Sequence, residues 1–221
     1  MTPAEKHRQR ILASKRTSDD VDASRKGANE YELMLMQLAE HKRSLKQAQS
    51  IERKKAMKSE IVSEYDAYID GVLDAKSGQQ DDVLMTLLIW HIDAGNYDRA
   101  LDIAEYAVSH DLQTPDQYER TIGCLIVEEI ADAALASDND ETPFNHDVLE
   151  RTAELTAELD MFDQVRAKFY RAIAESHERY GNEKEAIDFY ERALKLHDRV
   201  GCKQALNALK KKVEKDSESK A

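Results

Sequence analysis

Basic side chains recur in the first part of this 221-residue chain at spacings that suit contact with phosphate. Residues 1–60 hold 14 Lys and Arg against 9 Asp and Glu, a net charge of +5, whereas residues 61–200 carry −20 and the whole chain −12. On one continuous helix, Lys42, Lys46 and Arg53 would fall within about 40° of one another. Grouped cations of this kind neutralise phosphates. We therefore expect nucleic-acid contacts, with a solvated charged face as the alternative, from Lys6, Arg8, Arg10, Lys15, Arg16, Lys42, Arg43, Lys46, Arg53 and Lys54.

Carboxylates, histidines and cysteines give weaker signals for chemistry. The adjacent pairs Asp81–Asp82 and Glu128–Glu129 could serve a two-metal nuclease, but neighbouring residues of a helix point about 100° apart. Cys124 and Cys202 match no metal or redox motif, and we expect reduced thiols. The chain also lacks a P-loop or a nucleophile elbow. We expect no catalytic residue, no metal and no cofactor, because no metal-ligand spacing is shared by His7, His41, His91, His110, His146, His177 and His197.

The elements that must position these residues are helices. Seven Gly and three Pro leave few breaks, 41% of the residues are hydrophobic and 34% charged, and strand-like alternation is absent over any useful length. No apolar run approaches the roughly 20 residues of a membrane span. We predict an all-α protein in which an N-terminal arm and a long coiled-coil-like helix precede a helical body of antiparallel, tetratricopeptide-like helix hairpins.

The segment 78–112 predicts a buried helix hairpin at the centre of the fold. Its first helix, including Val83 to Trp90, is apolar on nearly all sides, as a fully buried helix is. Gly95 can take the left-handed conformation that ends a helix, and small alanines follow it at helical spacing. Residues 169–199 repeat the pattern around Gly181. Two imperfect hairpins do not make a solenoid, but they can offer a groove for a protein partner.

The chain from Glu30 to about Ala75 predicts one long helix, or two in line, because it has no proline and its single glycine lies near the end. Two apolar runs lie along it, out of phase by about one residue. Such seams need a partner, which is either the body of the same chain or another subunit. The expected oligomerisation residues are Tyr31, Met34, Leu38, Leu45, Ile61, Tyr65 and Tyr68.

These observations divide the chain into four segments. We expect a basic N-terminal arm and linker at 1–28, and a long helix for DNA binding and oligomerisation at 29–76. A central helical core follows at 77–137, and C-terminal helical hairpins with a tail occupy 144–221.

The central segment also resembles a known family. It resembles the core signature of the phage small terminase subunit family (GpM type), and shorter matching stretches extend the resemblance over roughly residues 1–200. The residues that carry it are Gly78, Gln80, Asp81, Asp82, Val83, Leu84, Met85, Thr86, Trp90, Asp93, Gly95, Asn96, Ala100, Leu101, Ile103, Ala104, Tyr106 and Ala107.

The resemblance implies a role in packaging viral DNA in the host bacterial cytoplasm, with no membrane partner. It implies three partners: viral double-stranded DNA, a large terminase subunit with ATPase and nuclease activity, and further copies of this chain, generally as a ring. Many members carry a helix-turn-helix near the N-terminus, whereas one short helix is expected here. Two alternatives stay open: a terminase endonuclease subunit that itself cuts DNA, and a tetratricopeptide-like adaptor with no DNA role.

Overall fold

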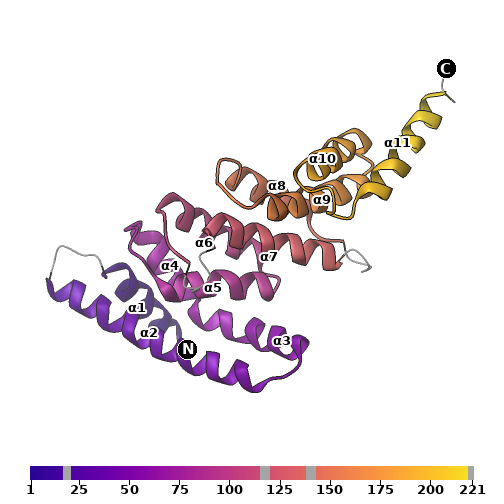
Figure 1. Cartoon of the computed structure of the whole chain (residues 1–221). Helices are drawn as coiled ribbons and strands as arrows, with labels where there is room; N and C mark the ends of the chain where they lie inside the picture. The colour runs from indigo at the N-terminus through magenta and orange to yellow at the C-terminus, as the bar shows by residue number, and fades with distance from the viewer. Residues whose placement is uncertain (17–20, 115–119, 138–142, 219–221) are drawn as a thin grey trace. The chain divides into compact units, whose positions relative to one another are not determined.

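The computed structural model describes residues 1–16, 21–114, 120–137 and 143–218, and every regular element in these ranges is helical. The all-α fold class is therefore confirmed. The chain forms two compact units, residues 1–122 and 123–221 (Figure 1). The boundary between them falls inside the expected segment 77–137. None of the described helices is both long and apolar enough to span a membrane.

Unit 1 is organised around α5 (Asp82–Asp93), a helix buried over most of its surface, as the sequence predicts. Its elements are α1 (Pro3–Ser14), α2 (Val21–Gln47), α3 (Ile51–Val62), the 3-10 turn η1 (Ser63–Tyr65), α4 (Asp66–Ala75), α5 (Asp82–Asp93) and α6 (Tyr97–Ser109). Val83, Leu84 and Leu87 of α5 have no exposed surface. Ala100 and Ala104 of α6 are equally buried, which allows the two helices to pack closely.

Both ends of α5 follow from its sequence. Asp81 caps the first turn, where its Oδ1 accepts the backbone N–H of Leu84 at 2.8 Å. At the other end, Gly95 has a φ of 77°, and the N–H of Asn96 donates to the carbonyl oxygen of His91 at 2.8 Å. The predicted hairpin and its glycine stop are confirmed.

The N-terminal arm is part of unit 1. Helix α1 begins with a capping box in which Thr2 and Glu5 each bond the other's backbone N–H. It packs against α4 so closely that a methyl group on Gly71 would overlap the carbonyl oxygen of Arg10. Much of the expected linker is helical, since α2 already begins at Val21, and residues 17–20 lie outside the described residues.

The expected long helix over 30–75, whether single or two helices in line, is wrong, because the chain breaks after α2 and turns back into α3 (Figure 1). Ser50 caps the new helix by accepting the N–H of Arg53 at 3.4 Å. The break lets both apolar runs reach the same core: Leu45 at the end of α2 and Ile61 in α3 are both buried. Out-of-phase runs on one straight helix would face different directions.

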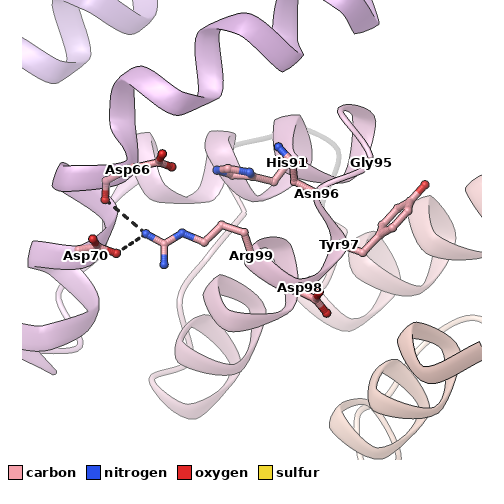
Figure 2. A pocket seen from close by; sticks show the side chains of 8 residues that line it. All are labelled: Asp66, Asp70, His91, Gly95, Asn96, Tyr97, Asp98 and Arg99. Atoms are coloured by element: carbon pink, nitrogen blue, oxygen red, sulfur yellow. Dashed lines mark hydrogen bonds and ion pairs between the residues drawn. The ribbon is translucent and has the colours of Figure 1, made fainter. Parts of the chain in front are cut away.

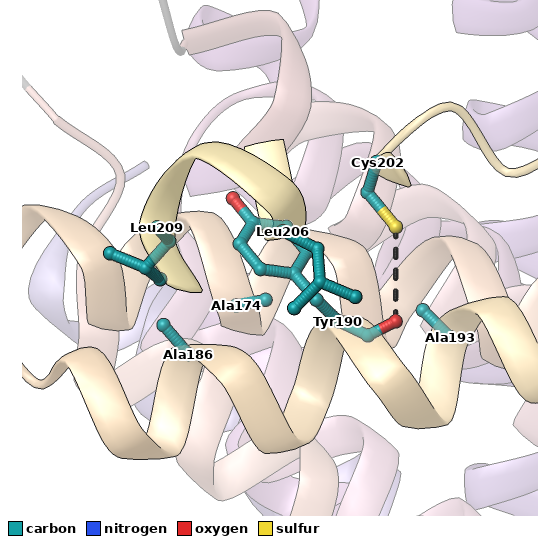
Figure 3. Packing of buried hydrophobic residues seen from close by; sticks show 7 residues of the cluster. All are labelled: Ala174, Ala186, Tyr190, Ala193, Cys202, Leu206 and Leu209. Carbon is teal, nitrogen blue, oxygen red and sulfur yellow. Dashed lines mark hydrogen bonds between the residues drawn. The ribbon is translucent and has the colours of Figure 1, made fainter. Parts of the chain in front are cut away.

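Unit 2 contains a second glycine-linked hairpin. The helices of unit 2 are α7 (Ile122–Ala136), α8 (His146–Leu155), α9 (Asp163–Arg179), α10 (Glu183–Leu196) and α11 (Lys203–Glu218). Gly181, between α9 and α10, has a φ of 76°. Tyr190 of α10 and Leu206 of α11 belong to one buried cluster, which Figure 3 shows. The Cys202 thiol donates a hydrogen bond to the Tyr190 carbonyl oxygen, with 3.9 Å between the sulfur and the oxygen. Cys124 is likewise a buried thiol.

Candidate nucleic-acid interface

The reversal between α2 and α3 gathers basic residues at one exposed corner. The basic turn, which we define as residues 42–55, holds six Lys and Arg and one acidic residue, Glu52. Lys46 and Arg53 are exposed and Lys54 is half-buried. Among the described residues, none of these three has an ion-pair partner within 4.0 Å. Their charges are therefore available to an outside anion.

The start of α3 adds to this positive character. The N-terminus of a helix carries a partial positive charge and directs backbone N–H groups toward an anion. Ile51, the first residue of α3, is 70% exposed beside it. Lys42 and Arg43 belong to the same turn but are partly engaged. Arg43 pairs with Glu40 at 2.7 Å. Lys42 donates to Thr86 Oγ1 at 3.3 Å, and burial lowers its pKa.

The basic side chains of α1 and of its C-cap, Lys15, are all solvent-exposed. Lys6, Arg8 and Lys15 are exposed. Arg10 forms a solvent-accessible ion pair with Asp74 at 2.5 Å, a kind of contact that contributes little net stability. These four side chains remain accessible to a phosphate.

Arg16 has a structural role that the sequence analysis did not foresee. Its guanidinium contacts Asp81 Oδ2 and the Gln80 carbonyl oxygen, each at 2.8 Å, and lies 3.7 Å from the centre of the Tyr31 ring. The Asp81 side chain is completely buried. Burial raises the pKa of Asp81, whereas hydrogen bonds from Leu84 N–H and the Tyr68 hydroxyl, together with Arg16, favour its charged form. Arg16 thus neutralises the buried cap of α5 rather than a phosphate.

The residues expected to form an oligomer seam already have partners inside unit 1. Tyr31 is half-buried, and the other six are buried. Gln9 donates to the Met34 sulfur at 3.1 Å, and the Tyr65 hydroxyl lies 2.8 Å from His41 Nδ1. Packing within the chain, the alternative reading of these seams, therefore accounts for them. Among the α2 side chains that the structure describes, the large apolar ones left exposed are Leu33 (55%) and Met36 (68%).

A pocket of about 620 Å³ opens between α4 and the α5–α6 turn (Figure 2). Arg99 lies on one side of the pocket. Its guanidinium donates a hydrogen bond to the carboxylate of Asp70 and another, at 3.3 Å, to the backbone carbonyl oxygen of Asp66. His91 lines the pocket too, and neither of its ring nitrogens has a hydrogen-bond partner among the described residues. The lining carries three carboxylates, including Asp98, against one guanidinium, so it repels phosphate.

One further cluster was missed by the sequence analysis. His146 and Glu150 of α8 meet His177 of α9, with one ligand atom from each lying within 4.8 Å of the others. The signal available was the spacing of four between His146 and Glu150, which places both on one helix face. His177 lies 27 residues after Glu150 in the sequence and joins them through helix packing.

Comparison with known proteins identifies the family of this chain. A family model described as "Phage small terminase subunit" matches residues 35–164, more than half of the chain. The chain belongs to the phage small terminase subunit family. It is also 34% identical over 212 residues to the "Terminase, endonuclease subunit" of Escherichia phage P2, covering 96% of this chain and 85% of that protein. No solved structure matches it.

The family assignment confirms the family that the residue signature around Gly78 indicates. As a small terminase, the chain has a role in packaging viral DNA. The matched region, 35–164, includes the basic turn and the buried α5–α6 hairpin.

Proposed function

We propose that this small terminase binds viral double-stranded DNA through the basic turn and the exposed cations of α1, assembles with further copies of itself, and recruits and regulates the large ATPase-nuclease subunit in the cytoplasm of the infected bacterium. The observation that carries the DNA role is the group of unpaired cations Lys46, Arg53 and Lys54 at an exposed corner of a chain whose total charge is −12. The acidic stretch 61–200, with a net charge of −20, repels phosphate and so favours contact at the basic residues of the N-terminal part.

DNA affinity measured at several salt concentrations tests this role. The triple variant Lys46→Ala, Arg53→Ala, Lys54→Ala should bind DNA more weakly and with a flatter salt dependence. Each lost phosphate contact lowers the slope by roughly 0.9 log units per log unit of salt. The matched control is the triple variant Lys210→Ala, Lys211→Ala, Lys212→Ala in α11. A larger loss in the control would place the DNA surface at the other end of the chain.

Assembly would use the exposed face of α2, because the buried seam is not accessible. Leu33 and Met36 lie one turn apart on this face, and an apolar pair left in solvent is a typical contact between subunits. A ring would add several weak basic turns into one strong DNA site. Light scattering should show that Leu33→Asp with Met36→Asp dissociates the oligomer and Ser44→Asp does not. A monomeric wild type at tens of micromolar would remove the proposal.

The large subunit would dock on unit 2, where hairpins of this kind can offer a protein groove. Phe162, at the start of α9, is 65% exposed and is the kind of aromatic side chain that anchors protein interfaces. Phe162→Ser should reduce stimulation of the large subunit's ATPase while leaving DNA binding intact. The control Ile11→Ser, at another exposed apolar residue, should leave both the stimulation and DNA binding unchanged. Full stimulation by Phe162→Ser would exclude this surface.

The phage P2 relative is called an endonuclease subunit, and DNA cleavage by the chain itself is therefore the second candidate function. Our proposal places cleavage in the large subunit. The purified chain incubated with viral DNA and Mg²⁺ or Mn²⁺ should bind without cutting, and cleavage should begin when the large subunit is added. Cutting by the chain alone would favour the endonuclease alternative.

A further inference from the structure

Three potential metal ligands of unit 2 converge where α8 packs against α9. Nε2 of His146 lies 3.2 Å from Oε1 of Glu150, and Nε2 of His177 lies 3.7 Å from the same oxygen. We propose that His146, Glu150 and His177 bind a divalent transition-metal ion of the zinc type. This site is independent of the proposed DNA surface.

The spacing of the ligand atoms fits such an ion. In a tetrahedral zinc site with bonds of about 2.0–2.1 Å, neighbouring ligand atoms lie roughly 3.3 Å apart. The two distances to Glu150 Oε1 fall on either side of this value, and all three ligand atoms lie within 4.8 Å of one another. Small side-chain rotations would therefore complete the geometry without moving either helix.

The remaining imidazole nitrogens have the partners that ligating histidines use. A metal-bound histidine normally holds its other nitrogen in a hydrogen bond, which fixes the ring and its tautomer. Nδ1 of His146 lies 2.9 Å from the Ser176 hydroxyl, which can accept its proton. Nδ1 of His177 lies 3.5 Å from the Asn182 amide nitrogen. Turning that amide over would present an oxygen to accept the second proton.

The electrostatic surroundings also favour a cation. Burial lowers the pKa of His177, as does the nearby His146, while Glu150 and Glu185 oppose the shift. A neutral imidazole is the form that binds a metal. Two carboxylates close to the two rings would then be partly neutralised by the bound ion. Both imidazoles are largely covered, with side-chain exposures of 20% and 9%.

The donor set narrows the choice of ion and the kind of site. Two imidazoles and a carboxylate suit zinc and its neighbours, whereas Mg²⁺ and Ca²⁺ prefer oxygen ligands. The Glu150 side chain is 51% exposed, so a fourth position would face solvent and hold water. Three protein ligands with one open position is the arrangement of reactive rather than purely structural zinc sites.

A simple hydrogen-bonded His–Glu network is the competing account, and Glu150→Gln separates the two. The glutamine oxygen still accepts hydrogen bonds from both rings, so such a network would survive, but a neutral amide is a poor metal ligand. The matched control is Glu154→Gln, one turn further along α8 and exposed. Both substitutions lie at exposed positions, so folding should be retained.

The test uses the full chain after a chelator has removed any metal. Calorimetry measures the binding of Zn²⁺, and visible absorption measures the binding of Co²⁺. We expect one ion per chain and the ligand-field bands of four- or five-coordinate cobalt. Glu150→Gln should weaken Zn²⁺ binding at least about tenfold, the loss that even an outer-shell change causes; Glu154→Gln should not.

Equal Zn²⁺ affinity of wild type and Glu150→Gln would overturn the proposal. So would the absence of Zn²⁺ binding, or a sulfur-to-cobalt charge-transfer band, which would assign the ion to Cys124 or Cys202. Binding should also weaken as the pH falls through the range in which histidines gain protons, because protons compete for the same nitrogens.

Discussion

Two helix hairpins of this molecule place a histidine at the same position and give it different surroundings. His91 precedes Gly95 in the α5–α6 hairpin as His177 precedes Gly181 in the α9–α10 hairpin. The glycines have φ values of 77° and 76°. In both hairpins the residue after the glycine donates its N–H to the carbonyl oxygen of the histidine, at 2.8 Å and 3.0 Å.

The side chains of the two histidines nevertheless differ in their chemistry. Both ring nitrogens of His91 are buried without a hydrogen-bond partner among the described residues. Burial, helped by the charge of Arg99, lowers the pKa of His91 to about 4. His177 instead faces His146 and Glu150 of α8. The hairpin fixes where the ring lies, and the neighbouring helix decides what the ring can do.

Lowering the pH should give the largest difference between the two histidines, measured as loss of stability. Because the folded-state pKa of His91 lies below its unfolded value of 6.5, the unfolded state binds protons more readily as the pH falls. The contribution of neutral His91 to the free energy of unfolding is therefore fully present above about pH 6.5. It is lost as the pH falls from there to about 4, and the loss is up to roughly 3 kcal/mol. Urea unfolding at pH 7 and pH 4 should show a smaller loss for His91→Gln than for wild type, with exposed His7→Gln as control. Parallel losses in all three proteins would contradict the pKa assigned to His91.

Zinc should stabilise the α9–α10 hairpin and the neighbouring α8, and it should leave the α5–α6 hairpin unchanged. With free Zn²⁺ at a hundredfold excess over its Kd, binding to the folded chain would stabilise it by about 2.7 kcal/mol. Hydrogen exchange should slow in α8, α9 and α10 of wild type, remain unchanged in α5 and α6, and show no zinc effect in Glu150→Gln. Protection appearing first in α5 or α6 would move the ion away from His177.

Alanine at the two glycines should give the smallest effects, and equal ones. Gly95 and Gly181 share the left-handed conformation, and nothing lies within 4 Å of a methyl group added to either. Gly95→Ala and Gly181→Ala should each cost roughly 1–2 kcal/mol, purely from the backbone. Thermal unfolding would measure this cost. A much larger loss at one glycine would reveal a contact made only in an assembly.

The sequence by itself determined the elements that depend on local signals. The apolar stretch Val83 to Trp90 fixed a buried helix, and Gly95 and Gly181 fixed the two hairpins, because left-handed conformations favour glycine. The motif around Gly78 indicated the family that comparison then established. The excess of cations in residues 1–60 was likewise visible as composition.

Only the tertiary structure decided which of these residues are accessible and which meet. No strong breaker marks the reversal at Ser50, so the sequence favoured one long helix or two in line. Packing of both apolar runs into one core imposed the turn. The same packing covered Leu38 and Tyr65 and committed Arg16 to Asp81. In unit 2, packing of α8 against α9 brought His177 to His146. Side-chain contacts between helices distant in sequence depend on how their faces align, which local periodicity does not specify.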